Sequence, residues 1–222
     1  ASSLQNINSS FVNGNISITS DQNYSVGGLV LESRNAGSIT VGNITSGGPS
    51  STVSFTHQGN LNLQGNINDS GSFAQIGTSG GTVFIGNTLP TTIQIGLGGA
   101  AFNRAVTLNR SLSLTAPVDI SFAQNLNSAV GQTSNLILNS AGILSFANNV
   151  GNTTALGVID ASAAALTGIT ATNVNSVIKA QSFNSGFVAG DINLTTPQTY
   201  STATGLNLTT VARAGTSNIT LG

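Results

Sequence analysis

The stretch Ile120-Ser-Phe-Ala-Gln-Asn-Leu-Asn-Ser-Ala-Val-Gly131 returns with few changes as Leu144-Ser-Phe-Ala-Asn-Asn-Val-Gly-Asn-Thr-Thr-Ala-Leu-Gly157. Each copy has the form apolar-Ser-Phe-Ala-polar-Asn-apolar and is followed by a polar turn with glycine. The phrase recurs after about 24 residues, an interval typical of a solenoid in which each repeat winds one coil. The doubled phrase therefore predicts a repeat protein.

Short apolar-polar-apolar triplets, separated by turns rich in Gly, Asn and Ser, recur along the whole chain. Each triplet predicts a strand of about three to five residues. In a parallel β-helix, residues one coil apart lie about 4.8 Å apart and bury each other. We therefore expect one inward ladder from triplets that follow one another at nearly constant steps, of about 22 to 23 residues, and that begin at Ile16, Ile39, Leu61, Val83 and Val106.

A second and less regular series of triplets lies between the members of the first. We assign it to Leu29, Val53, either Phe73 or Ile76, Ile93 and Leu112. Two interleaved series predict at least two strands per coil. Glycine and asparagine adopt left-handed backbone conformations more readily than other residues, which predicts corners of the coil at four Gly-Asn pairs: Gly14-Asn15, Gly42-Asn43, Gly59-Asn60 and Gly65-Asn66.

The C-terminal part of the chain continues this pattern. The segment 161–166 has helix propensity, but it lacks helix caps and length, so a strand with small inward residues is favoured over a short helix. The later triplets begin at Ile192, Leu206 and Ile219, at little more than half the spacing of the first series, which suggests successive faces of the coil. Since no linker or charge block interrupts the chain, the sequence predicts an all-β fold in a single continuous domain over residues 1–222. This fold is a parallel β-helix, or β-solenoid, of about 22–24 residues per coil.

The composition excludes several classes of partner. The chain has 222 residues, 39% of them hydrophobic, which is enough for a core, but only 5% are charged, against about 25% in a typical globular protein. Phosphate binding needs clustered basic side chains, and the five here are scattered, so we expect no nucleic-acid partner. No apolar run approaches the roughly 18 residues that span a bilayer, so we expect no membrane insertion. The basic residues are Arg34, Arg104, Arg110, Lys179 and Arg213.

The doubled phrase, together with the segment 191–208, resembles the repeats of filamentous-haemagglutinin-like large exoproteins, which include bacterial autotransporter adhesins. One phrase of that family matches Phe146, Ala147, Val150, Gly151, Ala155, Leu156 and Gly157 here. The other matches Thr195, Thr196, Gln198, Thr199, Tyr200 and Leu206. The resemblance implies a right-handed β-helix, secretion and a place on the cell surface or in the surrounding matrix. It covers the C-terminal half in detail and the N-terminal half only in style, and the secretion-domain motifs of such exoproteins are missing.

The ionisable residues do not suggest catalysis. Hydrolysis of glycosides needs two carboxylates about 5 to 10 Å apart, and the six acids form no close pair in the sequence. His57, the only histidine, is expected to be a polar residue at a strand end or turn. The chain has no cysteine and no calcium-binding nonapeptide, so we predict no catalytic, cofactor-binding or metal-binding residue, no cofactor and no enzymatic activity. The acids are Asp21, Glu32, Asp69, Asp119, Asp160 and Asp191.

These observations favour an extracellular structural or adhesive rod that contacts a host or neighbouring cell or serves as a rigid spacer. The alternative is a self-assembling subunit of an extracellular filament, sheath or surface layer. The chain begins at Ala1 without methionine, which suggests a processed or excised segment. Neither end resembles the capping coil that protects the exposed strands of a solenoid, so we expect the C-terminal edge to be covered by further coils or by another subunit.

Overall fold

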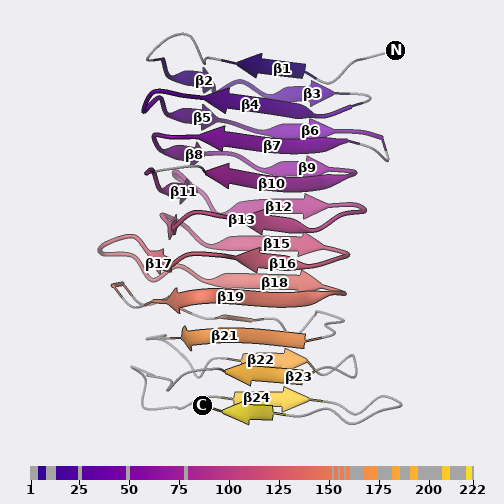
Figure 1. Ribbon diagram of the computed structural model, residues 1–222, viewed down its shortest axis with the longest axis vertical. Coiled ribbons are helices and arrows are strands. Elements are labelled where there is room, and N and C mark those ends of the chain that lie inside the picture. Colours follow the sequence, from indigo (N-terminus) through magenta and orange to yellow (C-terminus); the bar gives the residue numbers. More distant parts are fainter. Residues whose placement is uncertain are drawn as a thin grey trace.

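The computed structural model describes residues 5–8, 14–24, 27–48, 51–77, 80–151, 153–154, 156–157, 159–160, 168–174, 182–185, 191–194, 207–210 and 219–221. In these residues all regular structure is β-strand, and every strand pair is parallel. The strands stack along the long axis of the molecule, with the N-terminus at one end (Figure 1). The predicted β-solenoid is confirmed.

Each of the first six coils contributes one strand to each of three faces. The first face contains β1 (Gln5–Asn8), β4 (Leu29–Ser33), β7 (Thr52–His57), β10 (Ser72–Gly77), β13 (Ala100–Phe102), β16 (Ile120–Phe122), β19 (Ile143–Val150), β21 (Gly168–Val174), β23 (Asp191–Leu194) and β25 (Ile219–Leu221). The second contains β2 (Ile16–Ile18), β5 (Ile39–Val41), β8 (Leu61–Leu63), β11 (Val83–Ile85), β14 (Val106–Leu108) and β17 (Leu126–Ser128). The third contains β3 (Gln22–Tyr24), β6 (Ile44–Ser46), β9 (Ile67–Asp69), β12 (Thr91–Ile95), β15 (Leu112–Ala116), β18 (Leu136–Ser140), β20 (Ile159–Asp160), β22 (Ser182–Ser185) and β24 (Asn207–Thr210).

The long strand β19 joins the first two faces. Its Leu144 and Phe146 pair with β16, and its Val150 pairs with Leu126 of β17. The doubled phrase is therefore two successive coils in register, since Ile120 pairs with Leu144 and Phe122 with Phe146.

The second face confirms the predicted ladder. Ile16 pairs with Ile39, Ile39 with Leu61, Leu61 with Val83, and Val83 with Val106. All five side chains are buried, because alternate residues of a strand point to the same side of the sheet. The nearly constant step between these positions is thus the length of one coil on this face.

The second predicted series mixed two faces and needs correction. Leu29, Val53 and Phe73 do align on the first face, whereas Ile76 points outward and is 41% exposed. Ile93 and Leu112 belong instead to the third face, in β12 and β15. Coil length also varies more than predicted: the interval from Val53 to its partner Phe73 is shorter than the predicted coil, and the interval from Phe73 to its partner Ala100 is longer. Alternation of apolar residues marks a strand, but it does not identify the face.

Phenylalanines fill the interior of the first face. Phe102 stacks on Phe122 with ring centroids 5.0 Å apart and the planes at 2°. Phe122 stacks on Phe146 at 5.4 Å and 9°. Phe73 lies between Phe55 and Phe102, at 5.9 Å and 5.0 Å, with tilted rings. The five rings are at most 2% exposed and form one continuous aromatic column.

The Gly-Asn pairs do lie at corners of the coil, but for a different reason from the one predicted. Gly42, Gly59 and Gly65 do not have the left-handed φ that we expected. A Cβ on them would lie only 2.4 Å, 2.5 Å and 2.5 Å from a backbone atom of the preceding coil. Glycine is required there because the coils approach closely. Left-handed φ occurs elsewhere, at Asn35 (55°) and Ala36 (62°).

The C-terminal triplets lie partly on successive faces, as predicted. Ile192 and Ile219 pair directly on the first face, one coil apart. Of the triplet that begins at Leu206, the first residue lies outside the described residues, and Leu208 belongs to β24 on the third face, between Ile192 and Ile219 in sequence. The segment 161–166 lies outside the described residues, so the choice between strand and helix there stays a prediction.

Candidate functional site

Among the described residues, the ionisable side chains lie mostly apart, and the buried Nε of Arg104 has no hydrogen-bond partner. Asp21 accepts a hydrogen bond from Asn43 Nδ2 at 2.8 Å. Asp69 is 1% exposed and accepts from the Ser51 hydroxyl, while its Oδ2 has no partner among the described residues. Glu32 forms an ion pair with Arg34. Over the described part of the chain, no group of three His, Cys, Asp or Glu side chains could hold a metal ion.

His57 ends strand β7, as predicted for a strand end, but it is fully buried and part of a polar network. Its Nδ1 lies 2.7 Å from the Gly59 carbonyl oxygen, which can only accept, so we assign the proton to Nδ1. Nε2 then accepts from the Gln75 amide at 2.7 Å, and Gln75 Oε1 accepts from the Arg104 backbone N–H at 2.9 Å. The network links three coils through their interior.

Burial is the main cause that lowers the pKa of His57. The Gly59 hydrogen bond acts in the opposite direction, and the Arg104 charge lowers the pKa further. The imidazole is thus held neutral inside the coil, where no substrate reaches it because its exposed fraction is 0%. This geometry suits a structural role for the network.

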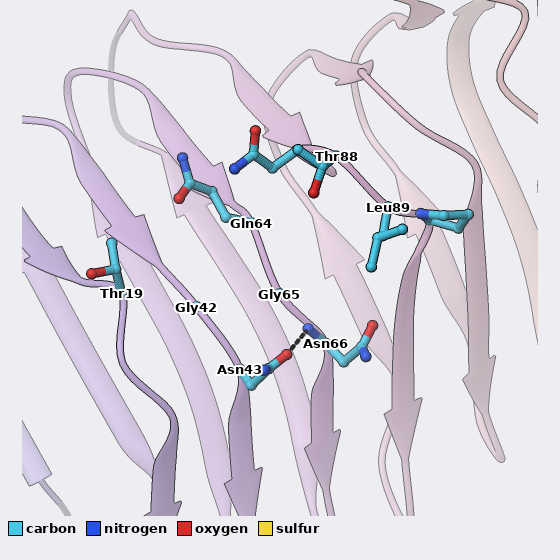
Figure 2. A pocket seen from close by; sticks show the side chains of 10 residues that line it. Thr19, Gly42, Asn43, Gln64, Gly65, Asn66, Thr88 and Leu89 are labelled. Atoms are coloured by element: carbon cyan, nitrogen blue, oxygen red, sulfur yellow. Dashed lines mark hydrogen bonds between the residues drawn. The ribbon is translucent and has the colours of Figure 1, made fainter.

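The candidate site is a surface groove at the corner between the second and third faces (Figure 2). Its cavity volume is about 360 Å³, within the range of small-molecule sites. Four successive coils supply its lining, through Thr19, Gly42 and Asn43, the segment 64–66, and the segment 87–90. None of these residues carries a charge.

The groove exists because the connections between faces differ in length. The second coil turns its corner with Gly42 and Asn43 alone, between β5 and β6, whereas a longer loop, from Gly86 to Pro90, joins β11 to β12. The longer loop stands out as a wall beside the glycine corners, and its Leu89 is 72% exposed. Pro90 ends this loop, directly before β12.

Asparagines hold the corners of adjacent coils together along the groove. The Asn66 backbone N–H donates to Asn43 Oδ1 at 2.8 Å, as Figure 2 shows, and the Thr92 N–H donates to Asn66 Oδ1 at 2.8 Å. The corner between the first and second faces uses the same arrangement, because the Thr82 N–H donates to Asn60 Oδ1 at 3.0 Å. Side-chain amides thus supply acceptors where the turn interrupts the ladder of backbone hydrogen bonds.

Sequence reasoning predicted no site residue and missed this groove. The Gly-Asn pairs that form its floor were recognised as corners. The feature that could have indicated a groove is the segment from Asn87 to Pro90, a polar stretch with one exposed leucine that follows a buried strand. Nothing in the sequence indicated that this segment lies beside the corners of the three preceding coils.

Comparison with known proteins adds no assignment: no protein-family model, curated protein or solved structure matches this chain. The likeness to filamentous-haemagglutinin-like exoproteins therefore stays a prediction. Over the described residues, no helix has the length and apolar character needed to cross a membrane.

Proposed function

We propose that this chain forms an extracellular, structural or adhesive β-helical rod of a bacterial surface exoprotein. The observation that carries the proposal is the unbroken parallel stacking of coils around one aliphatic and aromatic interior. Each added coil lengthens such a stack by about 4.8 Å without changing its cross-section. An architecture of this kind suits a spacer that holds a surface away from its point of attachment.

The outward side chains support a contact surface that does not depend on charge. On the second face, the outward positions of four successive coils are Thr40, Asn62, Phe84 and Thr107, three of them neutral and polar. Asn62 Nδ2 donates to Thr40 Oγ1 at 3.1 Å, so part of this surface is ordered by its own hydrogen bonds. Neutral polar ladders favour contacts that persist as ionic strength changes, which is useful outside the cell.

The alternative is a self-assembling subunit of a filament, sheath or surface layer. It is favoured by the sheet orders, in which β1, β2, β3, β24 and β25 each pair on one side only among the described strands. A strand with one open edge is a template for another strand.

Size and shape in solution separate the two proposals. Multi-angle light scattering with small-angle X-ray scattering on the whole chain should give a monodisperse, elongated monomer for the rod. Concentration-dependent polymers visible by electron microscopy would favour the filament instead. A compact particle would contradict both.

We also propose that the protein does not cleave polysaccharides, because a general acid and base need suitably placed ionisable groups. Incubation with glycan panels should release no new reducing ends. Cleavage that disappears on substitution of an aspartate would overturn this proposal.

A further inference from the structure

We propose that the groove between the second and third faces binds a neutral oligosaccharide. This inference deepens the adhesive role proposed above and rests on it, since it names what the adhesive surface would recognise. Four features carry it: a floor without side chains, walls with available amides and hydroxyls, one apolar wall, and a braced loop.

The floor is formed by Gly42 and Gly65, which lie at equivalent corners of successive coils (Figure 2). A Cβ at either position would lie within 2.5 Å of the backbone of the preceding coil. Stacking therefore excludes side chains from the floor. Gly42 is buried and Gly65 is partly exposed, so the floor offers a ligand a surface without side chains between the two walls.

The walls present hydrogen-bonding groups that the protein leaves available. Within the described residues, the side chains of Gln64, Asn87 and Thr88, which all line the groove, make no hydrogen bond with the protein. Figure 2 shows Gln64 and Thr88 along one side of the opening. Asn66 uses its Oδ1 to accept from Thr92, so its Nδ2 remains to donate. An amide both donates and accepts, as a sugar hydroxyl does, so the two kinds of group are complementary.

Leu89 and Pro90 form the apolar wall at the end of the same loop, and Figure 2 shows Leu89 across the opening from Gln64. Leu89 is 72% exposed at an end of the loop where a polar residue would be better solvated. The C–H-bearing face of a pyranose ring can cover this leucine while the hydroxyls at the ring edge face the amides. A single exposed leucine gives less contact area than an aromatic ring, so we expect weak binding.

Arg110 braces the loop that carries this wall. Its Nε donates to the Thr88 carbonyl at 3.3 Å, and its Nη1 donates to Gln132 Oε1 at 2.9 Å. Asn109 Nδ2 also donates to the Gly86 carbonyl at 3.2 Å. The next two coils thus hold the loop in place before any ligand arrives, which reduces the entropy lost on binding.

The lining disfavours other classes of ligand. Binding of phosphate, sulfate or a carboxylate favours a positively charged partner, and the lining holds none. The nearest charges, on Asp21 and Arg110, are engaged with Asn43 and with Thr88 and Gln132. A peptide strand would need an open sheet edge for backbone pairing, whereas the groove lies on a corner between paired strands. Neutral saccharide is the class that these groups fit best.

The test uses the whole chain with a panel of neutral gluco-, galacto-, manno- and N-acetylhexosamine oligomers of two to six units, with sulfated and sialylated oligomers and a neutral peptide as comparators. Binding is measured by titration calorimetry. The groove variants are Gln64→Ala, Asn87→Ala and Leu89→Asp. Matched controls outside the groove are Asn68→Ala, for an exposed amide, and Leu97→Asp, for a leucine that is 56% exposed. Thermal melts check that every variant is folded.

The expected result is binding of at least one neutral oligomer with Kd on the order of 1 mM. Each amide variant should weaken it about fivefold, the effect of one net hydrogen bond, and Leu89→Asp should abolish it, with both controls unchanged. The inference is overturned by absence of neutral binding, by equal binding to the groove variants, or by tighter binding of an anion or peptide. If any of these outcomes occurs while scattering still shows an elongated monomer, the proposed rod is retained and only the saccharide site is rejected.

Discussion

The interior of the first face is built in two ways within a few coils. From β13 to β19, one position of the strand is phenylalanine in every coil, and Phe102, Phe122 and Phe146 stack with nearly parallel rings. In the two coils before β13, the same strand position is Phe55 in β7 and Gln75 in β10, and Gln75 pairs with Phe102. The first region is dry and repetitive, and the second is a polar network.

The coil that contains β10 accommodates Gln75 because a large residue at the neighbouring inward position is paired with a small residue in the next coil. Phe73, two positions before Gln75, carries the ring into the adjacent column and lies 5.0 Å from Phe102. Its partner in the next coil is Ala100, which is small. The aromatic column thus holds a ring at each of these levels of the stack, but not always from the same strand position.

The largest effect is expected where rings lie on both sides of the mutated residue. Phe122→Ala should lower the free energy of unfolding by about 3 to 5 kcal/mol, because it removes a buried ring and leaves a cavity between its two neighbours. Phe146→Ala should fall in the same range. Denaturant titration measures both, with Val130→Ala, at a side chain that is 91% exposed, as a nearly neutral control. A small loss at Phe122 would mean that the column collapses to fill the gap.

The polar region should be damaged differently, by loss of partners and not of volume. Gln75→Leu is expected to lower the free energy of unfolding by about 2 to 3 kcal/mol, since it leaves His57 Nε2 and the Arg104 N–H unsatisfied. Gln94→Leu, on the exposed side of β12, serves as the control and should change stability by less than about 0.5 kcal/mol. If Gln75→Leu were stabilising, the network would be dispensable and the dry column the better solution.

Acid should weaken the polar region and leave the aromatic one unaffected. The pKa of His57 is lowered in the folded protein, so below about pH 6.5 the unfolded chain binds the proton first. Stability is therefore full above about pH 6.5 and falls as pH decreases toward the folded pKa, by no more than about 1.4 kcal/mol per pH unit for one proton. Melts between pH 5 and 7.5 measure this slope. His57→Gln should remove it, and an unchanged slope in that variant would assign it to other groups.

Side chains at the corners should contribute less to the free energy of unfolding than those of either interior region. Asn60→Ala removes the acceptor of the Thr82 N–H at an exposed corner that water can enter, so a loss of about 1 kcal/mol is expected. Asn68→Ala, an exposed amide in β9, is the matched control. Equal melting temperatures of the two variants would show that water replaces the corner amide fully.

The smallest effect is expected at the outer surface. Asp119→Asn should change stability by less than about 0.5 kcal/mol, because the side chain is exposed and the Asp119 carbonyl still accepts from the Ala100 N–H. Thermal melts of this variant beside Phe146→Ala rank the two sites. A larger loss of stability from Asp119→Asn than from Phe146→Ala would mean that the inward and outward positions have been assigned the wrong way round.

The same comparison explains how much of the fold could be predicted. The second-face ladder was predictable because its coils keep nearly constant length from Ile16 to Val106. The third face was merged with the first because a connection such as the loop from Gly86 to Pro90 changes the spacing without changing the apolar alternation. Gln75 could not be recognised as an interior residue, since its burial depends on His57 and Arg104 from other coils.

The groove was less predictable than the fold for a related reason. Its parts come from loops up to three coils apart, and only the stacking register brings Thr19 and Asn87 to one corner. Local patterns identify turns, but they do not give the height of one loop relative to another. The close approach behind Gly42 and Gly65 likewise depends on the neighbouring coil and not on local backbone conformation.

The direction of the hydrogen bonds between coils has a mechanical consequence. Strands of successive coils pair side by side along the stacking axis, as the stacked arrows of Figure 1 show. Their backbone hydrogen bonds therefore run along this axis, and a pulling force along it loads the bonds between coils directly. Each coil that detaches releases about 22 residues, or roughly 75 Å of contour length at about 3.4 Å per residue. Coils joined by the parallel rings of Phe102, Phe122 and Phe146 should resist longer than those near Gln75, where the rings are tilted and share the interior with polar groups. Under tension the molecule would lengthen in steps, yielding first where its interior is polar.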